Sequence, residues 1–180
     1  MTLGFSFEET MRLSNIKRWG IVEMSRPQSV AEHSYNVAMI STMVMNRLSR
    51  GGRGITHTLR LAVVEWALVH DLPELVTGDI PTPIKSMIKG PLATAERALF
   101  HTMALHEEAL PPLALAICKA ADLIDAIQFA TKFCVDSRRR EIINGLKCEL
   151  NRAGERLNSD RDKIALREVI RSICREEKTL

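Results

Sequence analysis

Apolar residues recur every third or fourth position along most of the chain, the spacing that places side chains on one face of an α-helix. The clearest run consists of Val30, Val37, Ile40, Val44 and Leu48. It begins after a Ser-x-x-Glu capping box at residues 29–32, in which each side chain accepts a hydrogen bond from the other residue's backbone. It ends at the glycine-rich residues 51–54. The pattern therefore predicts a long amphipathic helix between these two signals.

The same periodicity predicts helices over most of the remaining chain. The expected ranges are 5–16, 58–70, 72–77, 93–110 and 113–136, with two further helices separated near residues 159–160. Two prolines two positions apart predict an ordered loop over residues 78–83, because proline interrupts a regular helix. No segment alternates as a β-strand should. We expect an all-α bundle of about seven or eight helices, forming one domain of residues 1–180.

Composition narrows the class of protein. Hydrophobic residues make up 46% and charged residues 26% of the 180 positions, as in soluble globular domains. The four cysteines have no paired spacing, which disfavours a zinc knuckle or redox pair. No apolar run is long enough for a membrane span, and the first residues lack a secretory pattern, so we expect a cytoplasmic protein. A net charge of +3 suits an anionic small molecule and does not require nucleic acid.

Four side chains suggest a metal site: His33, His70, Asp71 and Asp122. Two imidazoles and two carboxylates suit Zn, Co, Mn or Fe, whereas Mg and Ca prefer oxygen ligands alone. Singly, each has a structural alternative, such as a helix cap for Asp71. Asp122 lies in an apolar stretch, where a buried carboxylate costs several kcal/mol unless it is paired or metal-bound. Asp125 shares roughly the same helix face and is the rival ligand. A salt bridge to an arginine is the structural alternative for Asp122.

In the order H…HD…D, these residues resemble the HD-domain phosphohydrolases. Longer strings are similar to the YfbR-type 5′-deoxynucleotidase branch: Arg18-Trp19, Glu32-His33-Ser34, His70-Asp71-Leu72-Pro73-Glu74, Thr77-Gly78-Asp79-Ile80-Pro81-Thr82-Pro83 and Lys119-Ala120-Ala121-Asp122. They span residues 18–122, and the last third of the chain carries no recognised motif. Within the branch, the chain length and the segment at residues 18–21 look more like short phage enzymes that hydrolyse dATP to deoxyadenosine and triphosphate. Those enzymes occur in viruses that replace adenine with diaminopurine.

The resemblance implies attack by water on the α-phosphorus, with the water activated at the metal. Glu74 follows the His-Asp pair and, in the family pattern, orients that water or accepts its proton. A solvent-facing helix residue is the structural alternative for Glu74. Asp79, in the predicted loop, is expected to donate a proton to the departing 5′ oxygen or to bind the sugar. Simple turn chemistry is the alternative for Asp79.

Three basic residues are candidates for binding the phosphates. Arg18 offers a planar group with paired donors for phosphate oxygens. Lys85 and Lys119 can add positive charge near the metal, although a lysine beside an acid is often only a surface pair. Several cations suit a triphosphate better than a monophosphate, and Mg²⁺ could accompany it. The arginines at residues 138–140 lack interleaved aromatics, so nucleic-acid binding is not expected.

Two residues near Arg18 are candidates for recognising the base. Trp19 could stack on a purine. Ile21 could press on the base edge and exclude a 2-amino group, rejecting dGTP and the diaminopurine nucleotide. In the alternative, both residues only anchor the first loop to the core. Trp66, within a predicted helix, is assigned to packing.

The leading hypothesis is therefore a metal-dependent dATP triphosphohydrolase using one Zn, Co or Mn ion. A 5′-deoxynucleotidase that releases phosphate from deoxynucleoside monophosphates is the main alternative. A cyclic-nucleotide phosphodiesterase is compatible with the same metal site. A nucleotide-sensing helical module is the non-enzymatic alternative, which Glu74 disfavours because a binder needs no water-activating carboxylate. Since the family forms dimers and rings of dimers, the resemblance implies a homo-oligomer, either a dimer or a hexamer.

Overall fold

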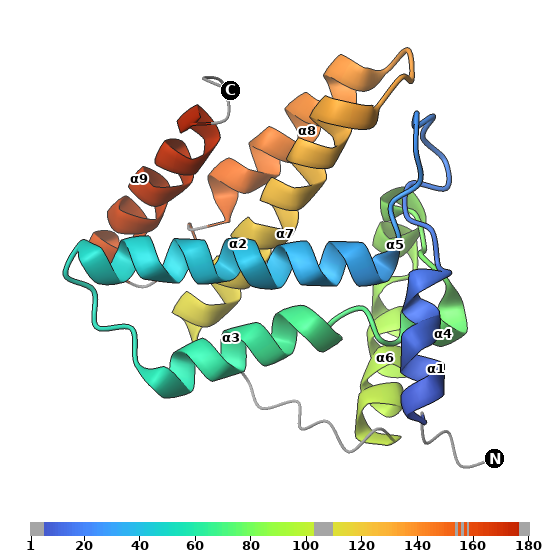
Figure 1. The fold of residues 1–180 in the computed structure, drawn as a ribbon, viewed down its shortest axis with the longest axis horizontal. Coiled ribbons are helices and arrows are strands. Elements are labelled where there is room, and N and C mark those ends of the chain that lie inside the picture. Colours follow the sequence, from blue (N-terminus) through green and yellow to red (C-terminus); the bar gives the residue numbers. More distant parts are fainter. Residues whose placement is uncertain (1–5, 103–109, 154, 156, 158, 177–180) are drawn as a thin grey trace.

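The computed structural model describes residues 6–102, 110–153, 155, 157 and 159–176, and these residues form helices and loops without a β-strand (Figure 1). The helices are α1 (Phe7–Met11), a 3₁₀ helix (Arg12–Ser14), α2 (Val30–Arg50), α3 (His57–Val69), α4 (Glu74–Thr77), α5 (Thr82–Met87), α6 (Lys89–Thr102), α7 (Pro112–Phe133), α8 (Arg139–Arg152) and α9 (Asp160–Glu176). The predicted all-α fold is confirmed. Within the described ranges, every helix is too short or too polar to span a bilayer.

Helices α2 and α7 form the centre of the molecule. Helix α2 crosses α7, with α3 on one side and α8 and α9 on the other, while α1 and α4–α6 gather near the beginning of α2 (Figure 1). Val37, Val44, Ile117 and Ile124 meet at this crossing and are almost completely buried. Burying one aliphatic side chain of this size contributes about 1.5–3 kcal/mol. The crossing therefore holds rigidly the helices from which the polar site is built.

The start of α2 confirms the predicted N-cap but only half of the predicted capping box. The Ser29 hydroxyl accepts a hydrogen bond from the Glu32 backbone N–H at 3.1 Å. The Glu32 carboxylate instead pairs with Arg26, at 2.6 Å and 3.0 Å. A charged guanidinium is a stronger partner for a carboxylate than a backbone amide, which explains the difference. The helix nevertheless begins where the sequence pattern placed it.

Several predicted boundaries are wrong by a few residues. Helix α5 begins at Thr82, inside the predicted loop, because Pro83 occupies the first helical turn, where its missing N–H costs no hydrogen bond. Helix α6 begins at Lys89 rather than at residue 93, and residues 103–109 of the predicted helix lie outside the described residues. The first helix ends at Met11 and continues only as the 3₁₀ turn. The remaining 15–29 segment is a loop.

This loop folds back on itself and runs alongside α7. The Ile16 carbonyl accepts from the Val30 N–H at 3.0 Å, and the Gln28 carbonyl accepts from the Arg18 N–H at 2.9 Å. Farther along the loop, the Ser25 N–H donates to the Phe133 carbonyl at the end of α7, at 2.8 Å. These bonds attach the loop that carries Arg18 to the start of α2 and to the end of α7.

Candidate active site

Three helices bring the predicted metal ligands together. His33 lies in the first turn of α2, His70 and Asp71 follow the end of α3, and Asp122 projects from the middle of α7. The Nε2 atoms of His33 and His70 lie 3.6 Å and 3.3 Å from Asp71 Oδ2, and His33 Nε2 lies 3.5 Å from Asp122 Oδ1. A tetrahedral ion with bonds of about 2.1 Å would separate its ligand atoms by about 3.4 Å. These spacings therefore fit one small divalent ion.

The four candidates do not all form one equally tight group. In the described part of the chain, ligand atoms of His33, His70 and Asp71 all lie within 4.8 Å of one another. Asp122 is in reach of His33, but its other carboxylate oxygen accepts from Lys119 Nζ at 2.9 Å. Asp122 is therefore the ligand that is partly turned away, toward Lys119.

Both imidazoles are oriented by hydrogen bonds behind them. His33 Nδ1 donates to Asp125 Oδ2 at 2.6 Å, and His70 Nδ1 donates to the Ala67 carbonyl at 3.0 Å. Each ring is left with Nε2 facing Asp71. His33 Nε2 is buried and has no hydrogen-bond partner in the described residues, which is costly unless a metal is its partner. This orphaned atom and the mixed nitrogen and oxygen donors fit a divalent transition metal.

Asp125, the rival ligand in the sequence, has a different position. It is 3% exposed and lies behind His33 rather than beside Asp71. Its Oδ2 also accepts from Gln28 Nε2 at 2.8 Å, and its Oδ1 accepts from Asn36 Nδ2 at 2.8 Å. Three N–H donors thus stabilise this carboxylate in the core. For Asp122, the arginine salt bridge considered as an alternative is not the arrangement found, since this carboxylate pairs with Lys119 Nζ at 2.9 Å.

Trp66 does more than fill the core, the role that its position in the sequence suggested. Its ring stacks on the imidazole of His70, with centroids 4.4 Å apart and an interplanar angle of 16°. The stacked indole restricts rotation of the imidazole that its backbone bond to Ala67 already orients. The only signal in the sequence was the spacing of four residues, which places both side chains on one face of a helix.

Local electrostatics favour the protonation states that a metal requires. Burial lowers the pKa of His70, so the imidazole is held in the neutral, coordinating form. Burial alone would raise the pKa of Asp122, but nearby positive charge, above all that of Lys119, outweighs it and lowers that pKa below its usual value. Neutral imidazole and ionised carboxylate are the forms that bind metals.

Glu74 lies at the start of α4 and is buried, with 5% of its surface exposed. Its Oε1 accepts from Lys85 Nζ at 2.9 Å, while the buried Oε2 has no partner among the described residues. Burial and the nearby Asp71 raise the pKa of Glu74 to about 7, although Lys85 opposes that rise. A carboxylate that titrates near neutrality and keeps one oxygen free is suited to accepting a proton from water. The solvent-facing alternative for Glu74 is wrong.

We expect Lys85→Met to shift the rising limb of the pH profile of kcat/KM toward higher pH. A proton-accepting Glu74 must be ionised, so activity should rise with pH through its pKa, which is about 7 without metal. A bound cation lowers that pKa, and so does Lys85, whose removal raises it. Lys89→Met, at an exposed position at the start of α6, is the control that should leave the midpoint unchanged. A midpoint unmoved in Lys85→Met would contradict this tuning.

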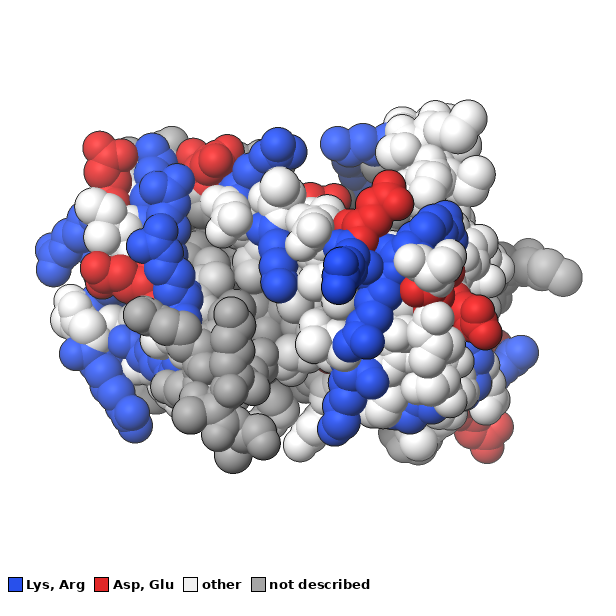
Figure 2. Space-filling model, turned by 90° about the horizontal axis from the view of Figure 1, so that it is seen from above, with Lys and Arg blue, Asp and Glu red and all other residues white. Residues whose placement is uncertain are grey.

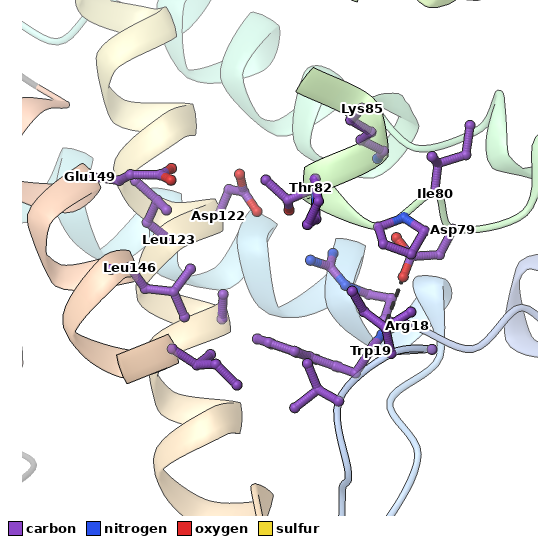
Figure 3. Close-up of a pocket in the computed structure, with 18 of the residues that line it drawn as sticks. Arg18, Trp19, Asp79, Ile80, Thr82, Lys85, Asp122, Leu123, Leu146 and Glu149 are labelled. Atoms are coloured by element: carbon purple, nitrogen blue, oxygen red, sulfur yellow. Dashed lines mark hydrogen bonds between the residues drawn. The ribbon is translucent and has the colours of Figure 1, made fainter. Parts of the chain in front are cut away.

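A cavity of about 630 Å³ adjoins the metal ligands. The other predicted site residues all line it: Arg18, Trp19, Ile21, Glu74, Asp79, Lys85 and Lys119. Figure 3 shows Arg18 and Asp122 pointing toward one another across this space. The sequence analysis did not predict that α8 forms one wall of the cavity, with Ile142, Leu146 and Glu149 among the lining residues. Their spacing indicated only an amphipathic helix, so nothing in the sequence marked them as pocket residues.

Trp19 is held in an uncommon backbone conformation at the edge of the cavity. Its φ is 69°, a value that costs a non-glycine residue roughly 1–3 kcal/mol. The Trp19 N–H donates to Asp79 Oδ2 at 3.2 Å (Figure 3), and its indole Nε1 donates to Gln28 Oε1 at 2.9 Å. Its ring also lies nearly parallel to that of Phe129, with centroids 6.3 Å apart. Asp79 therefore positions Trp19 as well as lining the cavity.

Two imidazoles, two carboxylates and a buried acid beside this cavity define a metal-dependent phosphohydrolase of the HD class. The chain belongs to the family described as 5′-deoxynucleotidase YfbR-like, whose model matches residues 6–97.

Relatives of two activities resemble the chain. It is 39% identical to a dATP triphosphohydrolase of Cyanophage S-2L over 123 residues, which is 67% of each protein. It is 28% identical to a dATP triphosphohydrolase of Acinetobacter phage SH-Ab 15497 over 71% of this chain and 68% of that protein. A 5′-deoxynucleotidase of Enterobacter sp. (strain 638) is 35% identical over 47% of this chain and 42% of its own length. The sequence resemblance therefore extends to enzymes acting on triphosphates and to 5′-deoxynucleotidases.

Solved structures support the fold over nearly the whole chain. The HD phosphohydrolase of Cyanophage S-2L, bound to dA and one catalytic Zn²⁺ ion, superposes with a TM-score of 0.81 at 26% identity and covers 98% of both chains. An HD-domain phosphohydrolase of Listeria innocua gives a TM-score of 0.62 at 20% identity, covering 94% of this chain and 86% of that one, and shows the fold alone.

Proposed function

We propose that this protein hydrolyses dATP to deoxyadenosine and triphosphate by attack of water on the α-phosphorus. The observation that carries the proposal is one cavity that joins the metal ligands, the free oxygen of Glu74 and three cationic side chains, Arg18, Lys85 and Lys119. The phage relatives named as dATP triphosphohydrolases support the choice of substrate. Three cations favour a triphosphate over the monophosphate of the 5′-deoxynucleotidase alternative.

The metal held by His33, His70, Asp71 and Asp122 would supply Lewis acidity, which makes water nucleophilic and withdraws charge from the phosphoryl oxygen. Zinc is the ion we propose, since the Cyanophage S-2L structure contains it and the ligands here suit it. Glu74 accepts the proton of the attacking water on its free oxygen, while Lys85 holds the other oxygen in place. A guanidinium nitrogen of Arg18 lies 3.5 Å from Asp71 Oδ2, so Arg18 can donate to the α-phosphate oxygens.

The nucleoside carries both the departing 5′ oxygen and the purine, and its proposed contacts are other residues that line the cavity. We propose that Asp79 protonates the departing 5′ oxygen or binds the sugar, and that Trp19 stacks on the purine. Ile21 lines the cavity and remains 56% exposed, so it is available to contact the base edge and exclude a 2-amino group. Ile142 and Leu146 supply an apolar surface from α8 for the same base.

The proposal is tested by incubating the zinc-loaded protein with deoxynucleoside mono-, di- and triphosphates in ¹⁸O-labelled water and identifying every product. We expect triphosphate carrying the label from dATP, little turnover of dGTP or of the diaminopurine deoxynucleoside triphosphate, and none of cyclic nucleotides. Attack on the α-phosphorus must place the new oxygen in the triphosphate. Phosphate released from dAMP without reaction of dATP would show a 5′-deoxynucleotidase instead. Nucleotide binding without turnover would show a sensing module.

The same proposal includes three properties of the whole protein: a cytoplasmic location, assembly into a homo-oligomer (a dimer or a hexamer) and no nucleic-acid partner. Arg138 donates to Asp136 at 3.2 Å and to the Ile21 carbonyl at 3.4 Å, so it supports the cavity loop instead of presenting a free charge. On the face seen in Figure 2, basic side chains are numerous but acidic and neutral ones interrupt them. Sedimentation analysis tests the oligomer, and titration with labelled DNA tests the absence of binding.

A further inference from the structure

Gln28 connects the cavity to the interior of the metal site. It is fully buried in the loop before α2, and both ends of its side-chain amide are hydrogen-bonded. Its Oε1 accepts from the indole Nε1 of Trp19 at 2.9 Å, and its Nε2 donates to Asp125 Oδ2 at 2.8 Å. The same Asp125 oxygen accepts from His33 Nδ1 at 2.6 Å. A continuous chain of three hydrogen bonds thus runs from Trp19 to His33.

The chemistry of the two neighbours leaves the Gln28 amide a single orientation. An indole N–H can only donate, and an ionised carboxylate can only accept. The amide must therefore turn its oxygen to Trp19 and its nitrogen to Asp125. An apolar side chain of the same length would leave the Trp19 indole N–H unpaired and remove one of the three donors to Asp125, and a glutamate would place a second carboxylate against Asp125. The bridge is thus specific to an amide of this length.

At the cavity end, Gln28 holds two of the residues proposed to contact the nucleotide, Arg18 and Trp19. Its backbone carbonyl accepts from the Arg18 N–H at 2.9 Å, and its side chain holds the Trp19 ring. The strained backbone of Trp19, with φ at 69°, is held by the N–H bond to Asp79 and by the Val22 N–H, which donates to the Trp19 carbonyl at 2.9 Å, while the bond to Gln28 fixes the indole. A change in the position of Gln28 would therefore remove the bond that fixes the Trp19 indole.

At the metal end, Gln28 shares an acceptor atom with a metal ligand. His33 and Gln28 both donate to Asp125 Oδ2, so the direction in which that oxygen points affects both. A metal-binding imidazole is oriented by the acceptor behind it, and loss of that acceptor typically lowers metal affinity. The position of Gln28 is thus linked to the orientation of His33 through one carboxylate oxygen.

We propose that Gln28 is a positioning residue that couples Trp19 to His33, so that the metal and the nucleoside bind with positive cooperativity. The nucleoside part of this inference rests on the proposed function. Coupling between two sites is reciprocal, because each ligand stabilises the arrangement that the other prefers. The expected size is the usual range for such coupling, about 5- to 150-fold in affinity.

The test uses a Trp66→Phe protein, which leaves Trp19 as the one remaining tryptophan of two. Zinc is titrated into the chelator-treated protein, with Trp19 emission read alongside a competing zinc dye. We expect the emission to change with zinc occupancy, and deoxyadenosine, which has no phosphate to hydrolyse, to tighten zinc binding by about 5-fold or more. In Gln28→Met, zinc should still bind, but both effects should be lost.

Two further variants make the result decisive. Gln28→Asn keeps the amide but is one methylene too short to reach both partners, so it should also lose the coupling. Ser41→Ala changes another fully buried polar residue, which lies in α2 and outside the chain of bonds, and it should retain the coupling. Circular dichroism checks that each variant folds.

Coupling that survives in folded Gln28→Met or Gln28→Asn would overturn the inference, and so would its loss in Ser41→Ala. If neither Gln28 variant folds, the zinc titration of the Trp66→Phe parent is the test. Trp19 emission that does not change as zinc binds excludes the coupling. Absence of dATP hydrolysis by the zinc-loaded protein with Trp66 intact would instead count against the proposed function, since the emission measurement requires no turnover.

Discussion

Glu74→Gln is expected to lower kcat by about 10²- to 10⁴-fold, the usual contribution of a general base. Glutamine keeps the size of the side chain and can still accept from Lys85, whose Nζ lies 2.9 Å from Oε1. It cannot accept a proton from water. Zinc affinity and the affinity for dATP should therefore change little, because Glu74 is not one of the proposed ligands. Steady-state kinetics, with nucleotide binding measured by calorimetry, separate the two effects.

Glu65→Gln provides the matched control, since it makes the same chemical change at an exposed position of α3. Its kcat should equal that of the parent. Unchanged turnover in Glu74→Gln would show that another group accepts the proton. Loss of zinc together with turnover would assign Glu74 to metal binding instead.

Asp125→Ala is expected to lower the free energy of unfolding by about 3–5 kcal/mol, as removal of one partner from a buried charged network does. Its carboxylate accepts from Gln28, Asn36 and His33, so its loss leaves two buried N–H donors and the half-buried Asn36 amide without this partner. The His33 imidazole also loses the bond that orients it, and zinc affinity should fall by about 10- to 100-fold. Urea denaturation of the chelator-treated protein and competition with a zinc dye measure the two quantities.

The control for Asp125→Ala is Asp160→Ala, which removes a carboxylate whose side chain is 88% exposed and 3.2 Å from Lys163. Exposed pairs contribute about 0–1 kcal/mol, so its stability should change little. Zinc affinity of Asp125→Ala equal to that of the parent would show that the Nδ1 hydrogen bond does not orient His33.

The helices that carry the site were predictable because their signals are local. The cap at Ser29 and the apolar spacing after it placed α2 correctly, and with it His33 in the first turn. The start of α5 at Thr82 was predicted to be loop because proline interrupts the interior of a helix. Proline in a first turn is compatible with a helix, and Pro83 occupies that position. Glu32 was also predicted incorrectly, because its carboxylate pairs with Arg26, six residues away, instead of accepting from the Ser29 backbone N–H.

The candidate site was predictable where the chemistry sits close together in the sequence. His70 and Asp71 are adjacent, and Glu74 follows within one turn, so their proximity needs no tertiary contact. Helical spacing could not choose between Asp122 and Asp125, because residues three apart on a helix differ in direction by only about 60°. The crossing of α2 over α7 made the choice by placing His33 between them, with Nε2 toward one and Nδ1 toward the other.

The sequence by itself determined an all-helical chain, the residue types of a metal site and the order in which they occur. Only the tertiary structure decided which polar groups share the interior: Gln28 bridges Trp19 and Asp125, and Lys85 pairs with Glu74. Periodicity reports which face of a helix is buried, but buried polar atoms must find partners wherever the packed helices bring them. That requirement acts between residues as many as 97 positions apart, where no local pattern can express it.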